Sequence, residues 1–106
     1  MGENDNIPQM TPSFENICRK DEKGIEYWSS RDLCGAMGYS AYWKFQRVID
    51  KAIKVAGEKG MNVDEHFNQA VDMVKIGNGS FRKVNIFRLS RMACMIIAEN
   101  ADGKKL

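Results

Sequence analysis

The side chains that could do acid–base or metal chemistry are few and scattered. The one histidine, His66, directly follows Asp64 and Glu65. Adjacent helical residues point about 100° apart, so these three do not converge on a substrate. A metal site needs three or four converging ligands, and His66 has neither a second histidine four residues away nor a cysteine close by. We therefore expect no catalytic residues, no metal site and no cofactor, and a hydrolase or nuclease built on His66 and Asp64 is the weakest alternative.

The three cysteines are another possible source of chemistry. Cys18, Cys34 and Cys94 are odd in number and far apart, which favours neither a disulfide framework nor a zinc site with close ligand pairs. A cysteine nucleophile needs a histidine to activate it, and each cysteine lies in an apolar setting. The stretch 77–80 lacks the spacing and lysine of a phosphate-binding loop. We expect reduced, structural thiols in a cytoplasmic protein, with no membrane span and no signal peptide, because no apolar run approaches about 20 residues.

Positive charge gathers in the second part of the chain. Residues 1–39 carry four Lys or Arg against seven Asp or Glu, a net −3, whereas residues 40–106 carry +5. At about 100° per residue, a helix over residues 41–56 has one apolar side and one basic side. The basic side carries Lys44, Arg47, Lys51 and Lys54. Trp43 projects beside Arg47 and Lys54, an unusual place for a large ring that normally packs inside.

This pattern favours nucleic-acid binding. Lysine and arginine neutralise phosphates, and an exposed tryptophan beside an arginine could stack on an unpaired base. A second basic group, formed by Lys75, Arg82 and Lys83, flanks a predicted hairpin. The alternative is a solvated helix face with Trp43 capping a small satellite core, and hairpin charges that protect strand edges from unwanted pairing. Single- and double-stranded DNA remain equally open as ligands.

Capping residues and glycines predict the elements that position these side chains. A hairpin should turn at Gly24, and Ser29, in a box with Asp32, should begin a helix that runs from Ser30 to Gly38. Ser40 should cap the basic helix, which we expect to end near Ala56. Asn62 should cap a short helix through residues 64–71. A second hairpin is predicted around the turn at 77–79, and a last helix, apolar almost all round from 92 to 98, should begin at Ser90.

Together these elements predict a small α+β domain with about four helices, two short β-hairpins and a winged-helix-like basic face. Residues 1–12 should form a disordered N-terminal segment, and residues 13–106 the domain. The ending ADGKKL has no natural stop, so we expect a domain excised from a longer protein. The apolar last helix is either the core of this domain or a surface for a protein partner.

Three motifs in order carry a resemblance over about residues 14–105. Residues 28–33 match an aromatic-Ser-x-Arg-x-Leu entry, residues 37–39 read Met-Gly-Tyr where relatives have Leu-Gly-Tyr, and residues 89–94 match a Leu-Ser-Arg-Tyr-Ala-Cys helix. In the last motif Met92 replaces tyrosine, which removes a hydroxyl group. The chain resembles the N-terminal domain of the DNA-damage-inducible protein D (DinD) family, within the wider BRO-N group of phage antirepressors and baculovirus proteins.

The resemblance implies a bacterial cytoplasmic protein of the DNA-damage (SOS) response without enzyme activity. BRO-N relatives are associated with DNA binding and transcriptional regulation, and the DinD branch with modulation of a recombinase filament. We therefore expect a non-catalytic DNA-binding or regulatory module. The alternative is a protein-interaction module, whose partner would be a recombinase, another regulatory protein, a second copy of the chain or the missing C-terminal region.

Overall fold

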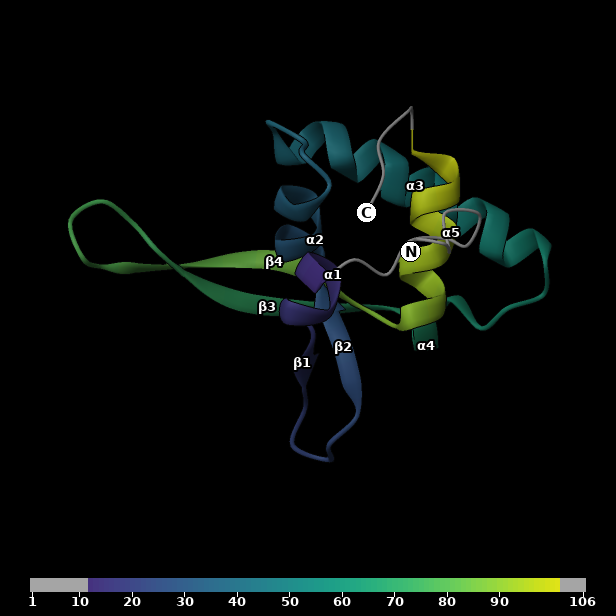
Figure 1. The fold of residues 1–106 in the computed structure, drawn as a ribbon, viewed down its shortest axis with the longest axis horizontal. Helices are drawn as coiled ribbons and strands as arrows, with labels where there is room; N and C mark the ends of the chain where they lie inside the picture. Colours follow the sequence, from purple (N-terminus) through teal and green to yellow (C-terminus); the bar gives the residue numbers. More distant parts are fainter. Residues whose placement is uncertain (1–11, 102–106) are drawn as a thin grey trace.

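The computed structural model describes residues 12–101, which form an α+β domain with five helices and one four-stranded antiparallel sheet (Figure 1). In chain order the elements are α1 (Pro12–Asn16), β1 (Arg19–Lys20), β2 (Glu26–Ser29), α2 (Ser30–Ala36), α3 (Tyr42–Glu58), α4 (Val63–His66), β3 (Phe67–Lys75), β4 (Phe81–Leu89) and α5 (Arg91–Asn100). The α+β class is confirmed. The disordered segment predicted for residues 1–12 lies outside the described residues, apart from Pro12, which begins α1.

The two predicted hairpins are parts of a single sheet with strand order β1-β2-β4-β3. They join where Trp28 pairs with Leu89 and Ser29 with Arg88. Trp28 and Leu89 are fully buried, so this junction lies in the core. Both predicted hairpins are therefore present, but the prediction did not include the β2–β4 contact, which links residues about sixty positions apart and which no local pattern reports.

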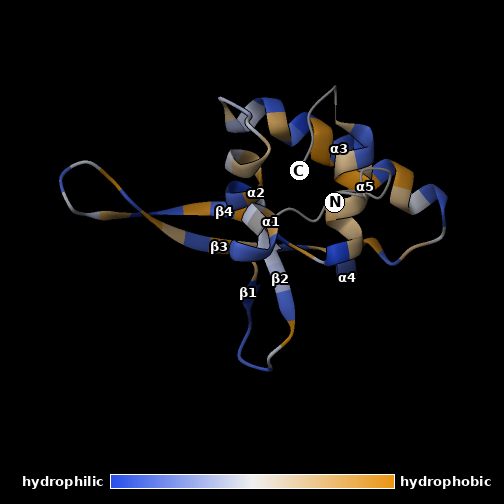
Figure 2. Cartoon of the chain, viewed as in Figure 1, coloured by the Kyte–Doolittle hydropathy of each residue, from blue (hydrophilic) through white to orange (hydrophobic). Residues whose placement is uncertain are grey.

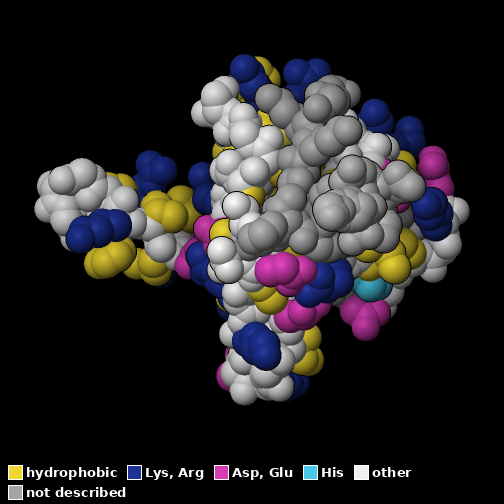
Figure 3. All heavy atoms as spheres, in the orientation of Figure 1, with side chains coloured by type: hydrophobic (Ala, Val, Ile, Leu, Met, Phe, Trp, Pro, Cys, Tyr) yellow, Lys and Arg dark blue, Asp and Glu magenta, His cyan; other side chains and the backbone are white. Residues whose placement is uncertain are grey.

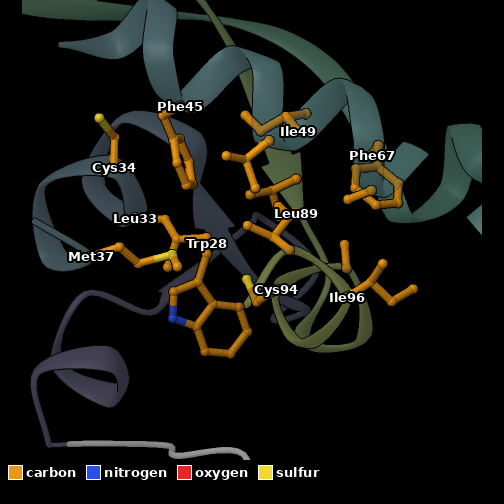
Figure 4. Close-up of a cluster of buried hydrophobic side chains, with 14 of the residues drawn as sticks. Trp28, Leu33, Cys34, Met37, Phe45, Ile49, Phe67, Leu89, Cys94 and Ile96 are labelled. Atoms are coloured by element: carbon orange, nitrogen blue, oxygen red, sulfur yellow. The ribbon is translucent and has the colours of Figure 1, made fainter. Parts of the chain in front are cut away.

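The core lies between the sheet, α2, α3 and α5 (Figure 4). Helix α5 buries Ala93, Cys94, Ile96 and Ile97 and packs against α3. Its nearly continuous apolar surface, visible in Figure 2, is therefore mostly interior. This decides between the two interpretations of the last helix in favour of the core. None of the helices in residues 12–101 combines the length and the apolar character that crossing a membrane requires.

Three of the predicted caps are confirmed and one is wrong. Ser29, Asn62 and Ser90 each accept a backbone N–H from the first turn of the helix that follows. Ser40 does not cap α3, which begins at Tyr42 after an extended Ala41 that makes no side-chain cap. A tertiary contact anchors this helix start instead, because the Tyr42 hydroxyl lies 2.7 Å from the Ser30 hydroxyl of α2.

The helix predicted through residues 64–71 ends at His66, because β3 begins at Phe67. Nine residue pairs join β3 to β4, from Phe67↔Leu89 to Lys75↔Phe81. Phe67 and Leu89 are buried at one end of this ladder, so its pairing and burial override the local helix pattern. The far end of the hairpin, residues 71–85, extends from the body as an arm (Figure 1).

Candidate nucleic-acid interface

Helix α3 presents all five of the side chains singled out on it to solvent. Trp43, Lys44, Arg47, Lys51 and Lys54 are exposed, while Phe45, Val48, Ile49, Ala52 and Ala56 of the same helix are buried. The Trp43 side chain is 61% exposed, which excludes the alternative that its ring caps a satellite core. In Figure 3, Lys and Arg side chains lie along the upper and right-hand edge of the molecule, where Figure 1 shows α3. The amphipathic period of α3 therefore places an aromatic ring and four cations on one side.

Among the described residues, the α3 cations are not neutralised by nearby carboxylates. Asp50, the acid closest to them on α3, accepts a hydrogen bond from Gln46 Nε2 at 3.0 Å. Within residues 12–101 no carboxylate forms an ion pair with Lys44, Arg47 or Lys51. The Lys44 ammonium lies 5.7 Å from the centroid of the Trp43 ring. No carboxylate of residues 12–101 thus competes with an anionic ligand for Lys44, Arg47 or Lys51.

A surface pocket of about 490 Å³ lies against this side of α3. Two aromatic residues, three cations and one amide contribute to its lining: Tyr39, Trp43, Lys44, Arg47, Lys51 and Asn100. Sequence reasoning missed Tyr39 and Asn100 as site residues. In the sequence, Tyr39 stood out only as part of the Met-Gly-Tyr motif at residues 37–39. Asn100, at the end of α5, carried no signal because it reaches α3 through tertiary packing.

The second predicted group of cations lies on the arm, where Lys75, Arg82 and Lys83 are all exposed. Paired residues of an antiparallel ladder point to the same face of the sheet, and successive residues alternate. The pairing Lys75↔Phe81 therefore places Lys75 and Lys83 on one face, and Val74↔Arg82 places Arg82 on the other. The structure thus brings four cations together on α3, while the arm cations form a separate, two-sided group.

His66 and the buried cysteines, the side chains considered for catalysis, have structural surroundings rather than those of an active site. His66 Nδ1 lies 2.6 Å from the Ser90 hydroxyl, and the Ser90 N–H donates to the His66 carbonyl, so this histidine fastens the end of α4 to the start of α5. All three cysteines are free thiols, and burial raises the pKa of Cys34 and of Cys94, which disfavours the reactive thiolate. Among residues 12–101 there is no group of three or more His, Cys, Asp or Glu able to hold a metal ion.

A curated protein is similar to this chain along most of its length, with 38% identity over 92 residues, or 87% of the chain. That relative is DNA damage-inducible protein D of Escherichia coli (strain K12). The chain spans about a third of the length of DNA damage-inducible protein D, since the match covers 34% of it. No family model matches the chain, and no solved structure matches it.

The motifs that carry the resemblance lie mainly in the core. Trp28, Leu33, Leu89 and Cys94 are buried, whereas Met92, which stands where the family motif has tyrosine, is 49% exposed. These motifs therefore support a shared fold. Apart from Tyr39, which belongs to the second motif and lines the pocket, the candidate interface lies outside them, so the motifs carry little information about its function.

Proposed function

We propose that this chain is a DinD-like, BRO-N-type DNA-binding module that acts without catalysis in the cytoplasmic DNA-damage response of a bacterium. The similar protein is named for its induction by DNA damage, which supports this setting. The observation that carries the DNA-binding part is the exposed Trp43 ring beside Arg47 and its neighbouring cations on α3, with no carboxylate partner in the described chain.

The physical basis is electrostatic. Lysine and arginine that approach phosphates displace condensed counterions, so affinity falls steeply with salt and by about one unit of log–log slope for each contact. In this proposal Lys44, Arg47, Lys51 and Lys54 contact phosphates, and Trp43 packs or stacks at the edge of the contact. The arm acts as a wing whose cations, Lys75, Arg82 and Lys83, reach a second stretch of backbone.

Charge reversal on α3 tests the proposal. The double substitution Arg47→Glu and Lys51→Glu should weaken binding of a short DNA at least about tenfold and reduce the salt slope by about two. Fluorescence anisotropy with labelled DNA across a salt series measures both. Both residues are exposed, so the variant should keep the thermal stability of the wild type.

The matched control is Lys20→Glu with Lys23→Glu, which makes the same change in net charge. These lysines are exposed on the β1–β2 hairpin, which Figure 1 shows on the other side of the body from α3. The control should bind DNA nearly as well as the wild type. Equal losses in both double variants would reduce the effect to net charge, and unchanged affinity in the α3 variant would remove this helix from the interface.

A second candidate, a protein-interaction module, is favoured by a different surface from the one the sequence indicated. Helix α5 is core, but Val71, Met73 and Phe81 on the arm are each more than half exposed. The pairings Val71↔Asn85, Met73↔Lys83 and Lys75↔Phe81 place these three side chains on one face. Adjacent exposed apolar side chains of this size are typical of contact surfaces for a recombinase, a regulatory protein or another copy of the chain.

Sedimentation velocity at several concentrations tests the case of a second copy. If the arm mediates self-association, the wild type should show a concentration-dependent sedimentation coefficient, and Val71→Ser with Phe81→Ser should remain monomeric. The control Ile25→Ser removes an apolar side chain that is 59% exposed on the other hairpin. If the wild type is monomeric at every concentration, self-association is excluded, and the protein-interaction module would have to bind a different protein.

A further inference from the structure

We propose that the pocket beside α3 binds an unpaired nucleotide, so that the module prefers single-stranded to double-stranded DNA. This inference deepens the proposed function and rests on it. The pocket has a volume of about 490 Å³, within the usual range of small-ligand sites, and it combines aromatic rings, cations and an amide. These are the groups that a base and its flanking phosphates require.

The aromatic part of the pocket suits the face of a base. Trp43 is 61% exposed, and its ring forms part of the pocket. The Tyr39 ring, on the same pocket, lies 5.1 Å from the buried Phe45 ring and is held there by the core. An aromatic side chain stacks on any base that offers a free face, whereas the bases of a duplex stack on one another. A Trp43 stack therefore selects an unpaired base.

The polar part of the pocket suits the rest of a nucleotide. Lys44, Arg47 and Lys51 lie one helical turn apart along the lining, close enough to contact phosphates on either side of the stacked base. The Asn100 amide nitrogen donates to the Ile96 carbonyl at 2.8 Å, which orients the side chain and leaves its amide oxygen as an acceptor. The described lining of the pocket thus offers aromatic stacking, positive charge and the Asn100 amide oxygen as a hydrogen-bond acceptor within a single site.

The two tryptophans of the chain provide a direct measurement. Trp28 is fully buried, with its ring stacked 4.4 Å from Phe14 and its N–H donated to the Phe14 carbonyl. Quenching of tryptophan fluorescence on binding therefore reports Trp43. The probes are an oligodeoxythymidine of about 12 nucleotides, an abasic oligonucleotide of the same length and charge, and a duplex of the same length.

The wild type should bind oligodeoxythymidine more tightly than the abasic strand or the duplex, and the thymidine strand should quench its fluorescence. By fluorescence anisotropy, Trp43→Ala should weaken thymidine binding by roughly 5- to 150-fold and abolish the preference over the abasic strand. Trp43→Phe should recover part of that preference. Met92→Ala, which removes a side chain 49% exposed on α5, is the control and should bind like the wild type.

A second matched pair separates the pocket from general charge. Lys51 contributes to the pocket and Lys54, three residues later and also exposed, does not. Lys51→Gln should weaken thymidine binding more than Lys54→Gln does. Equal binding of thymidine, abasic and duplex DNA, or a Trp43→Ala variant with an unchanged thymidine preference, would overturn this inference while leaving DNA binding intact. Failure to bind any of the three would overturn the proposed function as well.

Discussion

At the scale of single residues, Ser30 positions the candidate interface. Its side chain is fully buried, accepts the Phe87 N–H at 2.9 Å and lies 2.7 Å from the Tyr42 hydroxyl. One hydroxyl group therefore ties α2 to β4 and to the first turn of α3, directly before Trp43. In the sequence Ser30 was visible only as the first residue of a predicted helix.

Replacing this hydroxyl should be costly. Ser30→Ala leaves the partly buried Phe87 N–H and Tyr42 hydroxyl without this partner, and should lower the free energy of unfolding by about 1 to 3 kcal/mol. Urea denaturation measures the change. Ser80→Ala, on the exposed loop of the arm, should stay within about 0.5 kcal/mol of the wild type. A Ser30→Ala variant as stable as this control would show that the two groups find other partners.

At the scale of elements, the arm depends on the geometry of its loop. The Gly79 N–H donates to the Ile76 carbonyl at 3.0 Å, and the Ile76 N–H to the Ser80 carbonyl at 2.8 Å. Gly79 has a φ of 87°, in the left-handed region, as is common at the end of a three-residue hairpin loop. The hairpin predicted around residues 77–79 is present, but Asn78 has no positive φ, so the loop is not a two-residue type I′ Asn-Gly turn, which requires a positive φ at both central residues.

A side chain at Gly79 should loosen the arm without affecting the body. A Cβ there meets no atom within 4 Å, so Gly79→Ala should cost only the backbone strain of about 1 to 2 kcal/mol. Amide hydrogen exchange should become several-fold faster at residues 73–83 and stay unchanged in α3. Gly77→Ala is the control, because Gly77 has equal space and an ordinary φ. Equal exchange in the two variants would contradict this account of the loop.

At the scale of the whole molecule, Arg91 connects three elements. Its guanidinium forms ion pairs at 2.9 Å with Glu15 of α1 and with Glu26 of β2, and it lies 4.9 Å from the centroid of the Trp28 ring. Hydrogen bonds from Arg91 hold the pKa of both carboxyl groups below the usual value for glutamate, and they raise the pKa of Arg91. This arrangement fastens α1 over the core beside α5.

These lowered pKa values predict a loss of stability in acid. A carboxyl group whose folded pKa lies below its unfolded value of about 4.3 stabilises the fold above that pH, and the contribution disappears as pH falls through the folded pKa. Arg91→Met should therefore melt a few degrees below the wild type at pH 7, with a difference that shrinks below about pH 4. Thermal melts followed by circular dichroism measure it.

The control for this prediction is Lys59→Met, which also removes one positive charge, from an exposed position directly after α3. It should melt close to the wild type at both pH values. If the difference in melting temperature between Arg91→Met and the wild type stayed constant from pH 7 to pH 3, the ion pairs would not be its cause, and the loss would come from packing on Trp28 alone.

The sequence by itself determined the features that depend on a few neighbouring residues. Ser29, Asn62 and Ser90 start helices because each side chain bonds a backbone N–H within the next turn. The apolar period of residues 41–56 predicted which face of α3 is buried, and Gly24 marked the turn of the first hairpin. Trp43 stood out for the same reason, because a helix period alone places it opposite the core.

Tertiary structure alone decided the features that join distant residues. Pairing of Trp28 with Leu89 merges the hairpins into one sheet, and pairing of Phe67 with Leu89 turns a predicted helix into a strand. Packing of α5 on α3 brings Asn100 to the pocket. In each case the contact joins residues more than twenty positions apart. Helix periodicity and capping depend on residues within one or two turns, so they cannot predict such contacts.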